Sequence, residues 1–331
     1  MAITITGGVN ISGGVVLEPP AGSPSPGGGG ASNFGYNLGG FNGGSNSTTI
    51  DKFSFASDGN ASDVGDTLGR TNGNTGQSSS THGYASGSGG PSDSNGLIQK
   101  FAFASDGNTA ASATLSVKRG SGAAGSSSSS NGYTAGGRAS GNNFNVIDKF
   151  PFASDDNATD VGDLTATPYI LVGQNSADSG YASGGNSGPT GSPAWTTVNT
   201  IEKFPFASDG NATDVGDLTV ARSNLAGQSS SSSGYGSGGQ PTPGNLAGNV
   251  IDKFPFASDS NATDVGDVTV ARRQLSGTSS TASGYCAGGE AASGSPAIQN
   301  IIDKFPFASD GNATDVGDLT GVTQAGAGVQ Y

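Results

Sequence analysis

The chain has 331 residues, of which 32% are apolar and 59 are glycine, and its 26 acidic and 13 basic side chains give a net charge of −13 at pH 7. This charge disfavours nucleic acid or an anionic membrane as the main partner, because phosphate binding needs clustered lysine and arginine. No apolar run approaches the ~20 residues of a membrane-spanning helix, so we expect no membrane insertion. The single cysteine, Cys286, cannot form an internal disulfide, and we interpret it as a buried thiol.

Residues 1–31 are interpreted as a leader and a linker that precede the main domain. Residues 18–30 (EPPAGSPSPGGGG) have the composition of a Pro/Gly linker. The start lacks the basic region and continuous apolar core of a signal peptide, which indicates synthesis in the cytoplasm. The leader is either disordered or held by a neighbouring subunit. Its apolar residues alternate with polar residues or glycine, as in one or two short strands, and are the candidate docking residues: Ile3, Ile5, Val9, Ile11 and Val15.

Residues 32–331 repeat a segment that is clearest at 201–217, IEKFPFASDGNATDVGD. Six units of about 50 residues predict an all-β, six-bladed β-propeller with four-stranded blades. A second mark, Tyr-x-x-Gly-Gly or a close variant, has the same period at Tyr36, Tyr84, Tyr133, Tyr181, Tyr235 and Tyr285. The first phenylalanines of the copies are Phe53, Phe101, Phe150, Phe204, Phe254 and Phe305.

Each unit reads as four strands, most clearly between residues 219 and 268. The third of these strands shows apolar alternation. Pro255 within it cannot donate to a ladder, which predicts an open pairing position or a bulge. The predicted strands are 226–233, which is small and hydroxyl-rich, 234–239, 249–257 and, after an Asp/Asn turn, 262–268.

The two ends of the repeat region predict how the ring closes. The first unit starts at Gly35 and Tyr36 with no hydroxyl-rich strand before it, whereas the last unit continues past Asp318. We therefore predict that residues 324–331 complete the first blade by pairing with the strand around 34–39, which leaves no free edge.

The order of motifs within the units resembles Kelch repeats. An Ala-Arg or similar pair precedes Gly-Tyr-x-x-Gly-Gly, a strand, an Asp/Asn turn and a last strand. The clearest matches are Arg222 with Tyr235 and Arg272 with Tyr285. Kelch repeats usually carry a tryptophan in the fourth strand, and the chain departs from that pattern with Val64, Val161, Val215, Val265 and Val316.

The turns before the fourth strands carry a possible metal-ligand pattern. Asp209, Asn211, Asp214 and Asp217 lie at i, i+2, i+5 and i+8. Such oxygen ligands suit Ca²⁺, but the spacing is not that of an EF-hand loop. We interpret the acids as turn-forming residues and expect no cofactor, with Ca²⁺ binding as the alternative. Similar sets begin at Asp58, Asp155, Asp259 and Asp310.

The sequence provides few residues for catalysis. His82 is the only histidine and cannot form a multi-histidine metal site. Glutamate occurs only at Glu18, Glu202 and Glu290, which disfavours a glycosidase with paired carboxylates. We therefore expect a protein that is not an enzyme.

The loops between the second and third strands vary most, at 87–96, 186–197, 240–248 and 290–298. Variable loops on a rigid scaffold are common recognition sites. Trp195 is expected either to contact a sugar or protein or to cap its own blade. The candidate recognition residues are Trp195, Tyr169, Pro193, Pro241 and Pro243.

The near-identical FPFASDGNATDVGDLT-type repeats with Ser-rich spacers resemble repeat proteins of marine bacteriophages, including cyanophages, and the MAITITGG start is similar in style to phage structural proteins. This resemblance implies a non-enzymatic virion protein made in the host cytoplasm: a tail fibre, a tail-associated protein or a capsid decoration. Its leader would bind other virion proteins, and its propeller would recognise a host-surface glycan or protein. The alternatives are a purely structural assembly or decoration protein, and a cell-surface carbohydrate-binding or polysaccharide-acting propeller.

Overall fold

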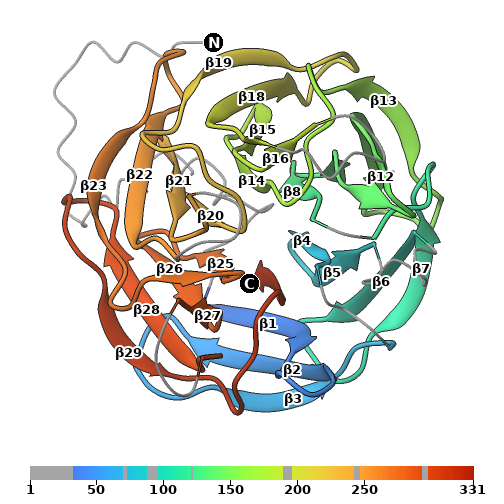
Figure 1. Cartoon of the computed structure of the whole chain (residues 1–331). Coiled ribbons are helices and arrows are strands. Elements are labelled where there is room, and N and C mark those ends of the chain that lie inside the picture. Colours follow the sequence, from blue (N-terminus) through green and yellow to red (C-terminus); the bar gives the residue numbers. More distant parts are fainter. Residues whose placement is uncertain are drawn as a thin grey trace, which may run out of the picture.

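The computed structural model describes residues 33–69, 73–87, 96–120, 122–188, 196–241, 247–292 and 297–331. The predicted leader, residues 1–31, lies outside this part of the chain. All regular elements within it are strands, and 24 of the 30 form six four-stranded antiparallel sheets around a central axis (Figure 1). The predicted all-β, six-bladed propeller is confirmed. Among the described residues there is no helix long and apolar enough to cross a lipid bilayer.

Blades 1 to 3 are built from strands between β1 and β13, and blade 1 also includes the C-terminal strand. In each blade the first strand named is the one nearest the axis and the last is the outermost. Blade 1 contains β30 (Ala327–Gln330), β1 (Phe34–Phe41), β2 (Asn46–Ser54) and β3 (Ser62–Asp66). Blade 2 contains β4 (Thr75–Ser78), β5 (His82–Ser86), β6 (Leu97–Ala102) and β7 (Ala110–Thr114). Blade 3 contains β8 (Ala124–Ser127), β9 (Asn131–Ala135), β12 (Val146–Pro151) and β13 (Thr159–Asp163).

The other three blades repeat this arrangement. Blade 4 contains β14 (Val172–Asn175), β15 (Ser179–Ser183), β18 (Thr200–Pro205) and β19 (Thr213–Asp217). Blade 5 contains β20 (Ala226–Ser229), β21 (Ser233–Ser237), β22 (Val250–Pro255) and β23 (Thr263–Asp267). Blade 6 contains β25 (Ser276–Ser279), β26 (Ser283–Ala287), β28 (Ile301–Pro306) and β29 (Thr314–Asp318).

Short two-stranded ladders sit on the connections of three blades. Because each has two residues per strand, they have no readable alternation in the sequence. They are β10 (Arg138–Ala139) with β11 (Asn142–Asn143), β16 (Asn186–Ser187) with β17 (Thr196–Thr197), and β24 (Arg272–Arg273) with β27 (Glu290–Ala291).

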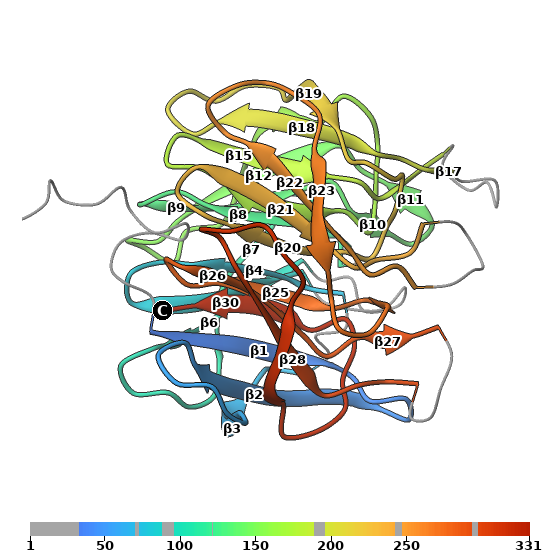
Figure 2. The same cartoon turned by 90° about the vertical axis from the view of Figure 1, so that its left-hand side faces the viewer.

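The ring closes through the C-terminal strand, as predicted. β30 pairs antiparallel with β1 from Gly35 opposite Gln330 to Leu38 opposite Ala327, and Phe41 forms a further bridge with Gln324. Figure 2 shows β30 beside β1. Blade 1 therefore takes its innermost strand from the end of the chain, and main-chain hydrogen bonds close the propeller.

The glycine of the Gly-Tyr mark is required by the phenylalanine opposite it. Gly234 on β21 pairs with Phe254 on β22, and a Cβ at Gly234 would lie 2.3 Å from the Phe254 ring. Any larger residue would displace that ring from the core.

Tyrosines and phenylalanines then pack between neighbouring blades. Tyr235 of blade 5 stacks on Phe307 of blade 6 with ring centroids 4.8 Å apart, and it also contacts Phe305 at 5.5 Å. Aromatic pairs at such distances add to the stabilisation from burial. Val265 packs against the same cluster, at the position of the tryptophan in Kelch repeats. The repeated Tyr and Phe-Pro-Phe motifs are thus the contacts that join one blade to the next.

Pro255 ends β22 and lies beyond the outer ladder. The β22–β23 pairing stops at Lys253, so the open pairing position predicted at Pro255 is present. A register shift occurs earlier, between Ile251 and Asp252, where Gly266 on β23 has a φ of 156°.

The propeller has two different faces. The loop face is the end of the propeller at which the second strand of each blade ends and the third begins, and its described connecting residues include 42–45, 136–145, 184–188, 196–199, 238–241, 247–249, 288–292 and 297–300. The turn face carries the other hairpin turns together with Asn33 and Tyr331, where Phe34 N donates to Tyr331 O at 2.7 Å. Figure 2 shows β11, β17 and β27 at one end of the molecule and the C-terminus at the other.

Candidate functional site: the loop face and the axial channel

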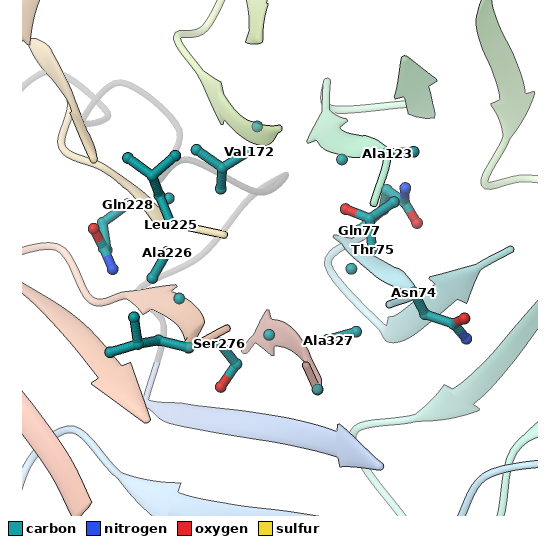
Figure 3. Close-up of a pocket in the computed structure, with 18 of the residues that line it drawn as sticks. Asn74, Thr75, Gln77, Ala123, Val172, Leu225, Ala226, Gln228, Ser276 and Ala327 are labelled. Atoms are coloured by element: carbon teal, nitrogen blue, oxygen red, sulfur yellow. The ribbon is translucent and has the colours of Figure 1, made fainter. Parts of the chain in front are cut away.

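The six innermost strands surround a cavity of about 150 Å³ on the propeller axis (Figure 3). Its described lining consists of small, amide, hydroxyl and aliphatic residues and includes no ionisable side chain. The amide group of Asn74 is buried at the cavity without a hydrogen-bond partner among the described residues. This cavity, which we call the axial channel, therefore offers hydrogen-bonding groups to a small polar molecule. Its described lining provides no acid or base for proton transfer.

A ring of glycines sets the width of this channel. A Cβ on Gly173 would lie 2.0 Å from the carbonyl oxygen of Gly125, and one on Gly328 would lie 2.1 Å from that of Gly277. Only glycine permits the innermost strands to approach this closely. The ring consists of Gly76, Gly125, Gly173, Gly227, Gly277 and Gly328.

Main-chain hydrogen bonds form a second closed ring at the loop-face end of the channel. Each of six residues, one before each innermost strand, donates its N–H to the carbonyl oxygen of its counterpart in the preceding blade, at 2.6–3.1 Å. All six have a left-handed φ between 55° and 81°. This conformation is unfavourable for a β-branched residue such as Ile170, so the ring holds it in place. The residues are Gly73, Gly122, Ile170, Asn224, Gln274 and Ala325.

The acidic turns on the turn face form ion pairs between blades. Lys253 of blade 5 contacts Asp310 of blade 6 at 2.9 Å, and Lys304 of blade 6 contacts Asp58 of blade 1 at 2.9 Å, which closes the circle. The described residues contain no group of three or more His, Cys, Asp or Glu side chains arranged to hold a metal ion. The remaining pairs are Lys52–Asp106, Lys100–Asp155, Lys149–Asp209 and Lys203–Asp259.

Asparagines of the Asp/Asn turns also link neighbouring blades. The Asn261 Oδ1 accepts the N–H of Asp217 in the preceding blade at 3.0 Å, and the Asn60 Oδ1 accepts that of Asp318 at 3.1 Å. A turn-forming role within one repeat does not predict this contact, because the partner lies in the preceding blade. Equivalent bonds involve Asn108, Asn157, Asn211 and Asn312.

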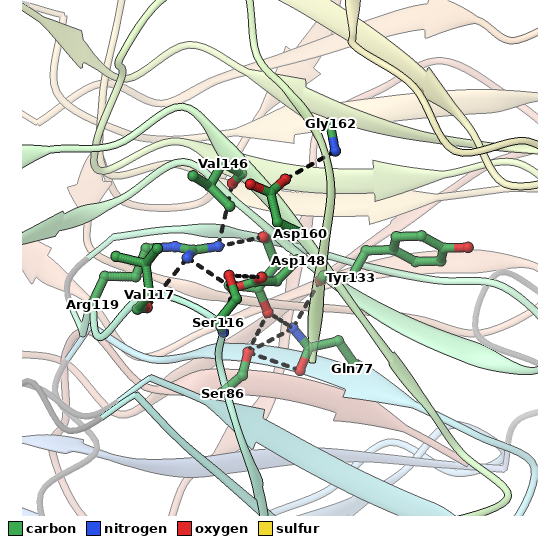
Figure 4. A network of polar contacts seen from close by, with 11 residues as sticks. Gln77, Ser86, Ser116, Val117, Arg119, Tyr133, Val146, Asp148, Asp160 and Gly162 are labelled. Atoms are coloured by element: carbon green, nitrogen blue, oxygen red, sulfur yellow. Dashed lines mark hydrogen bonds and ion pairs between the residues drawn. The ribbon is translucent and has the colours of Figure 1, made fainter. Parts of the chain in front are cut away.

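Arginines in the links between blades are buried in networks of main-chain carbonyls and one aspartate. In blade 3, Arg119 is 1% exposed and donates to Asp148 at 2.8 Å and to the Thr134 carbonyl at 2.7 Å (Figure 4). Ser116 also donates to Asp148 through its N–H at 3.2 Å. Arg222–Asp252 and Arg272–Asp303 are the equivalent pairs in blades 5 and 6. The Kelch-like arginines are therefore structural residues that tie each link to its blade.

Some described basic residues belong neither to the Lys–Asp pairs nor to the buried arginines, and these lie on loop-face connections. Arg138 lies over the Tyr169 ring at 5.0 Å, and Arg273 pairs with Glu290 at 2.9 Å. Lys118 lies in the link before β8. The loop face thus carries positive groups on a strongly acidic protein.

Few of the candidate recognition residues lie within the described part of the chain. Tyr169 is 6% exposed beneath Arg138, so its ring is packed rather than open to a ligand. Pro241 is half-buried on the loop face. Trp195, Pro193 and Pro243 lie outside the described residues, as do the leader residues Ile3, Ile5, Val9, Ile11 and Val15.

Neither the cysteine nor the histidine belongs to a reactive cluster. Cys286 is fully buried, as predicted, and burial raises the pKa of its thiol to about 12. His82 accepts or donates a hydrogen bond with Thr81 at 2.8 Å on the turn face, and burial lowers its pKa.

Comparison with protein-family models gives no match, and comparison with curated proteins gives no significant match.

Proposed function

We propose that the protein is a non-enzymatic virion component whose leader binds other particle proteins and whose loop face recognises a glycan or protein on the host surface. The observation that carries this proposal is the position of Asn33, the first described residue, on the turn face beside Tyr331. The variable connections leave the opposite face. A propeller attached through residues 1–31 thus presents its variable loops away from the attachment point.

The internal contacts of the propeller support a recognition role rather than a catalytic one. Its repeated charges are used in contacts within and between blades, as in the pairs Arg222–Asp252 and Lys253–Asp310. The channel lining has no ionisable group among the described residues. Association would depend on the shape and hydrogen bonds of the loop face and on arginines such as Arg138, a residue type that is enriched at protein interfaces.

Particle isolation tests the proposal. We expect the full-length chain to sediment with virus particles from a producing culture, and a variant that lacks residues 1–31 to stay in the supernatant. Absence of the full-length chain from purified particles would overturn the proposal.

Host adsorption separates recognition from decoration. Particles with Trp195→Ala, and particles with Arg138→Ala, are expected to contain the protein at wild-type levels and to adsorb to host cells less. Asp310→Ala on the turn face is the matched control and should leave adsorption unchanged. Normal adsorption by all of these particles would favour the purely structural decoration role.

A further inference from the structure

Blade 4 lacks the arginine that is buried in blades 3, 5 and 6. In blade 5, the Arg222 guanidinium donates to Asp252 at 2.8 Å and to the carbonyl oxygens of Gly236, Gly238 and Val250 at 2.8–2.9 Å. The residue of blade 4 that aligns with Arg222 is Pro168, which has no side-chain donor.

The acceptors of this network are nevertheless retained in blade 4. A cavity of about 40 Å³ is lined there by Glu202, Ala182, Gly184 and Thr200, which align with Asp252, Gly236, Gly238 and Val250 of blade 5. It has room for about three water molecules. Pro168 lines the same cavity. The cavity of blade 4 therefore has the same position, and the same kind of acceptor residues, as the site that the Arg222 guanidinium occupies in blade 5.

Glu202 is a buried carboxylate without a basic side chain in the cavity. It is 4% exposed, and its Oε2 accepts the N–H of Thr165 at 2.7 Å. Thr219 makes the same contact with Asp252 in blade 5. None of the residues that line the cavity is Lys, Arg or His. A buried carboxylate with no cation is costly, so a cation that reached the cavity would be bound favourably.

We propose that this cavity binds a guanidinium group, held by the Glu202 carboxylate and the carbonyl oxygens of Ala182, Gly184 and Thr200. A planar guanidinium presents five or six N–H donors in fixed directions and is less strongly hydrated than an ammonium ion. The acceptors come from several directions, as they do around Arg222. Ser187 and Val198 of the loop-face connection also line the cavity, so the group enters from the loop face, either as a small ion or as the arginine side chain of a partner.

Thermal denaturation of the full chain with millimolar methylguanidinium tests the site. We expect a saturable rise in melting temperature of about 2–4 °C over sodium chloride at the same ionic strength. Urea, a neutral molecule of similar shape, and ammonium chloride are the control ligands. An equal effect of methylguanidinium, ammonium and sodium, or no effect of methylguanidinium, would overturn the proposal.

Equilibrium dialysis with labelled guanidinium provides a second readout that does not depend on stability. The wild-type chain should bind one ion, and Glu202→Gln should bind at least tenfold more weakly. Asp264→Asn, which removes a carboxylate at the equivalent position of the blade 5 ladder, opposite Asp252, is the matched control and should retain binding. Equal binding by wild type and Glu202→Gln would contradict the assignment.

Comparison of a small and a larger ligand shows whether the guanidinium group belongs to a free ion or to the arginine side chain of a partner. N-acetyl-arginine amide competes for the site if a partner's arginine can enter it. Binding of methylguanidinium without competition by the arginine derivative supports a free ion. Failure to bind either ligand overturns the inference, and this result would leave the particle-sedimentation test of the proposed function unaffected.

Discussion

Individual residues differ widely in what they contribute to this propeller, and the buried arginines provide the sharpest test. Arg222→Met leaves Asp252 buried without its cation, which is expected to cost about 3–5 kcal/mol in the free energy of unfolding. Lys253→Met removes a half-exposed partner of Asp310 and should cost about 0–1 kcal/mol. Denaturant titration measures both values. A similar small cost for both variants would contradict the role assigned to Arg222.

The glycine ring predicts a second contrast between two equally small substitutions. In Gly227→Ala, the new Cβ would lie 2.3 Å from the carbonyl oxygen of Gly173, and the innermost strands must separate. Gly210→Ala lies in a hairpin turn where the new Cβ meets nothing within 4 Å. We expect a loss of several degrees in melting temperature, or failure to fold, for the first variant and little change for the second. A stable Gly227→Ala would show that the strands are less tightly packed than described.

Glu202 predicts a pH-dependent stability in the absence of guanidinium. Burial raises the pKa of Glu202, and Asp214 adds to the rise. The folded state then binds the proton more tightly than the unfolded state, whose pKa is about 4.3. Stability is fully present below that value and falls as the pH increases through the raised pKa.

Comparison of Glu202→Gln with wild type isolates this effect from that of Asp51, whose pKa is also raised by burial. The melting temperature of Glu202→Gln minus that of wild type should increase between about pH 4 and pH 7, because only wild type loses stability through Glu202. A constant difference across this range would show that Glu202 has the same pKa in both states.

The sequence identifies residues whose role is local and repeated, and it misses roles that depend on a distant partner. The apolar alternation in the third strand of each unit predicts that its two phenylalanines share one face, and Phe305 and Phe307 both pack on Tyr235. The function of Asn261 and of Asp310 depends on a contact from the preceding blade, which no spacing within one repeat reveals.

At the level of elements, the C-terminal strand closes the ring and predicts a large effect of truncation. Deletion of residues 327–331 removes β30, which exposes the inner edge of β1 and opens the channel. Unpaired edge strands promote association between chains. We expect the truncated protein to aggregate and to lose cooperative melting. Deletion of residues 1–31 is the control and should leave a soluble protein with the wild-type melting temperature. A monomeric, cooperatively melting truncated protein would contradict closure by β30.

The strands were predictable because each has a regular pattern, whereas the links between blades were not. The innermost strands have the small, hydroxyl-rich sequence on which the prediction of a strand at 226–233 rests, although β20 ends at Ser229. The ring of left-handed residues includes Ile170 and Gln274, which are not residue types that favour this conformation. Tertiary hydrogen bonds impose it, so the local sequence gives no signal.

The whole molecule is held together by concentric rings of contacts that repeat from blade to blade. Near the axis lie the glycine ring and the main-chain hydrogen bonds, and farther out lie the tyrosine–phenylalanine stacks. The Lys–Asp pairs and the asparagine bonds join the blades on the outside. Because each blade depends on both neighbours, we expect the propeller to open cooperatively rather than one blade at a time.

Cys286 reports directly on this opening. It is the only cysteine, it is completely buried on β26, and its pKa is about 12, so the native thiol is neither accessible nor ionised at pH 8. Labelling by a water-soluble disulfide reagent therefore requires opening of the blade 5–blade 6 interface. The rate should be far below that of unfolded protein, should rise strongly in Arg272→Met, and should change little in Lys52→Met, a control in the distant blade 1–blade 2 interface. Rapid labelling of the native wild-type protein would show that blades open independently, because global unfolding is too rare to expose the thiol at that rate.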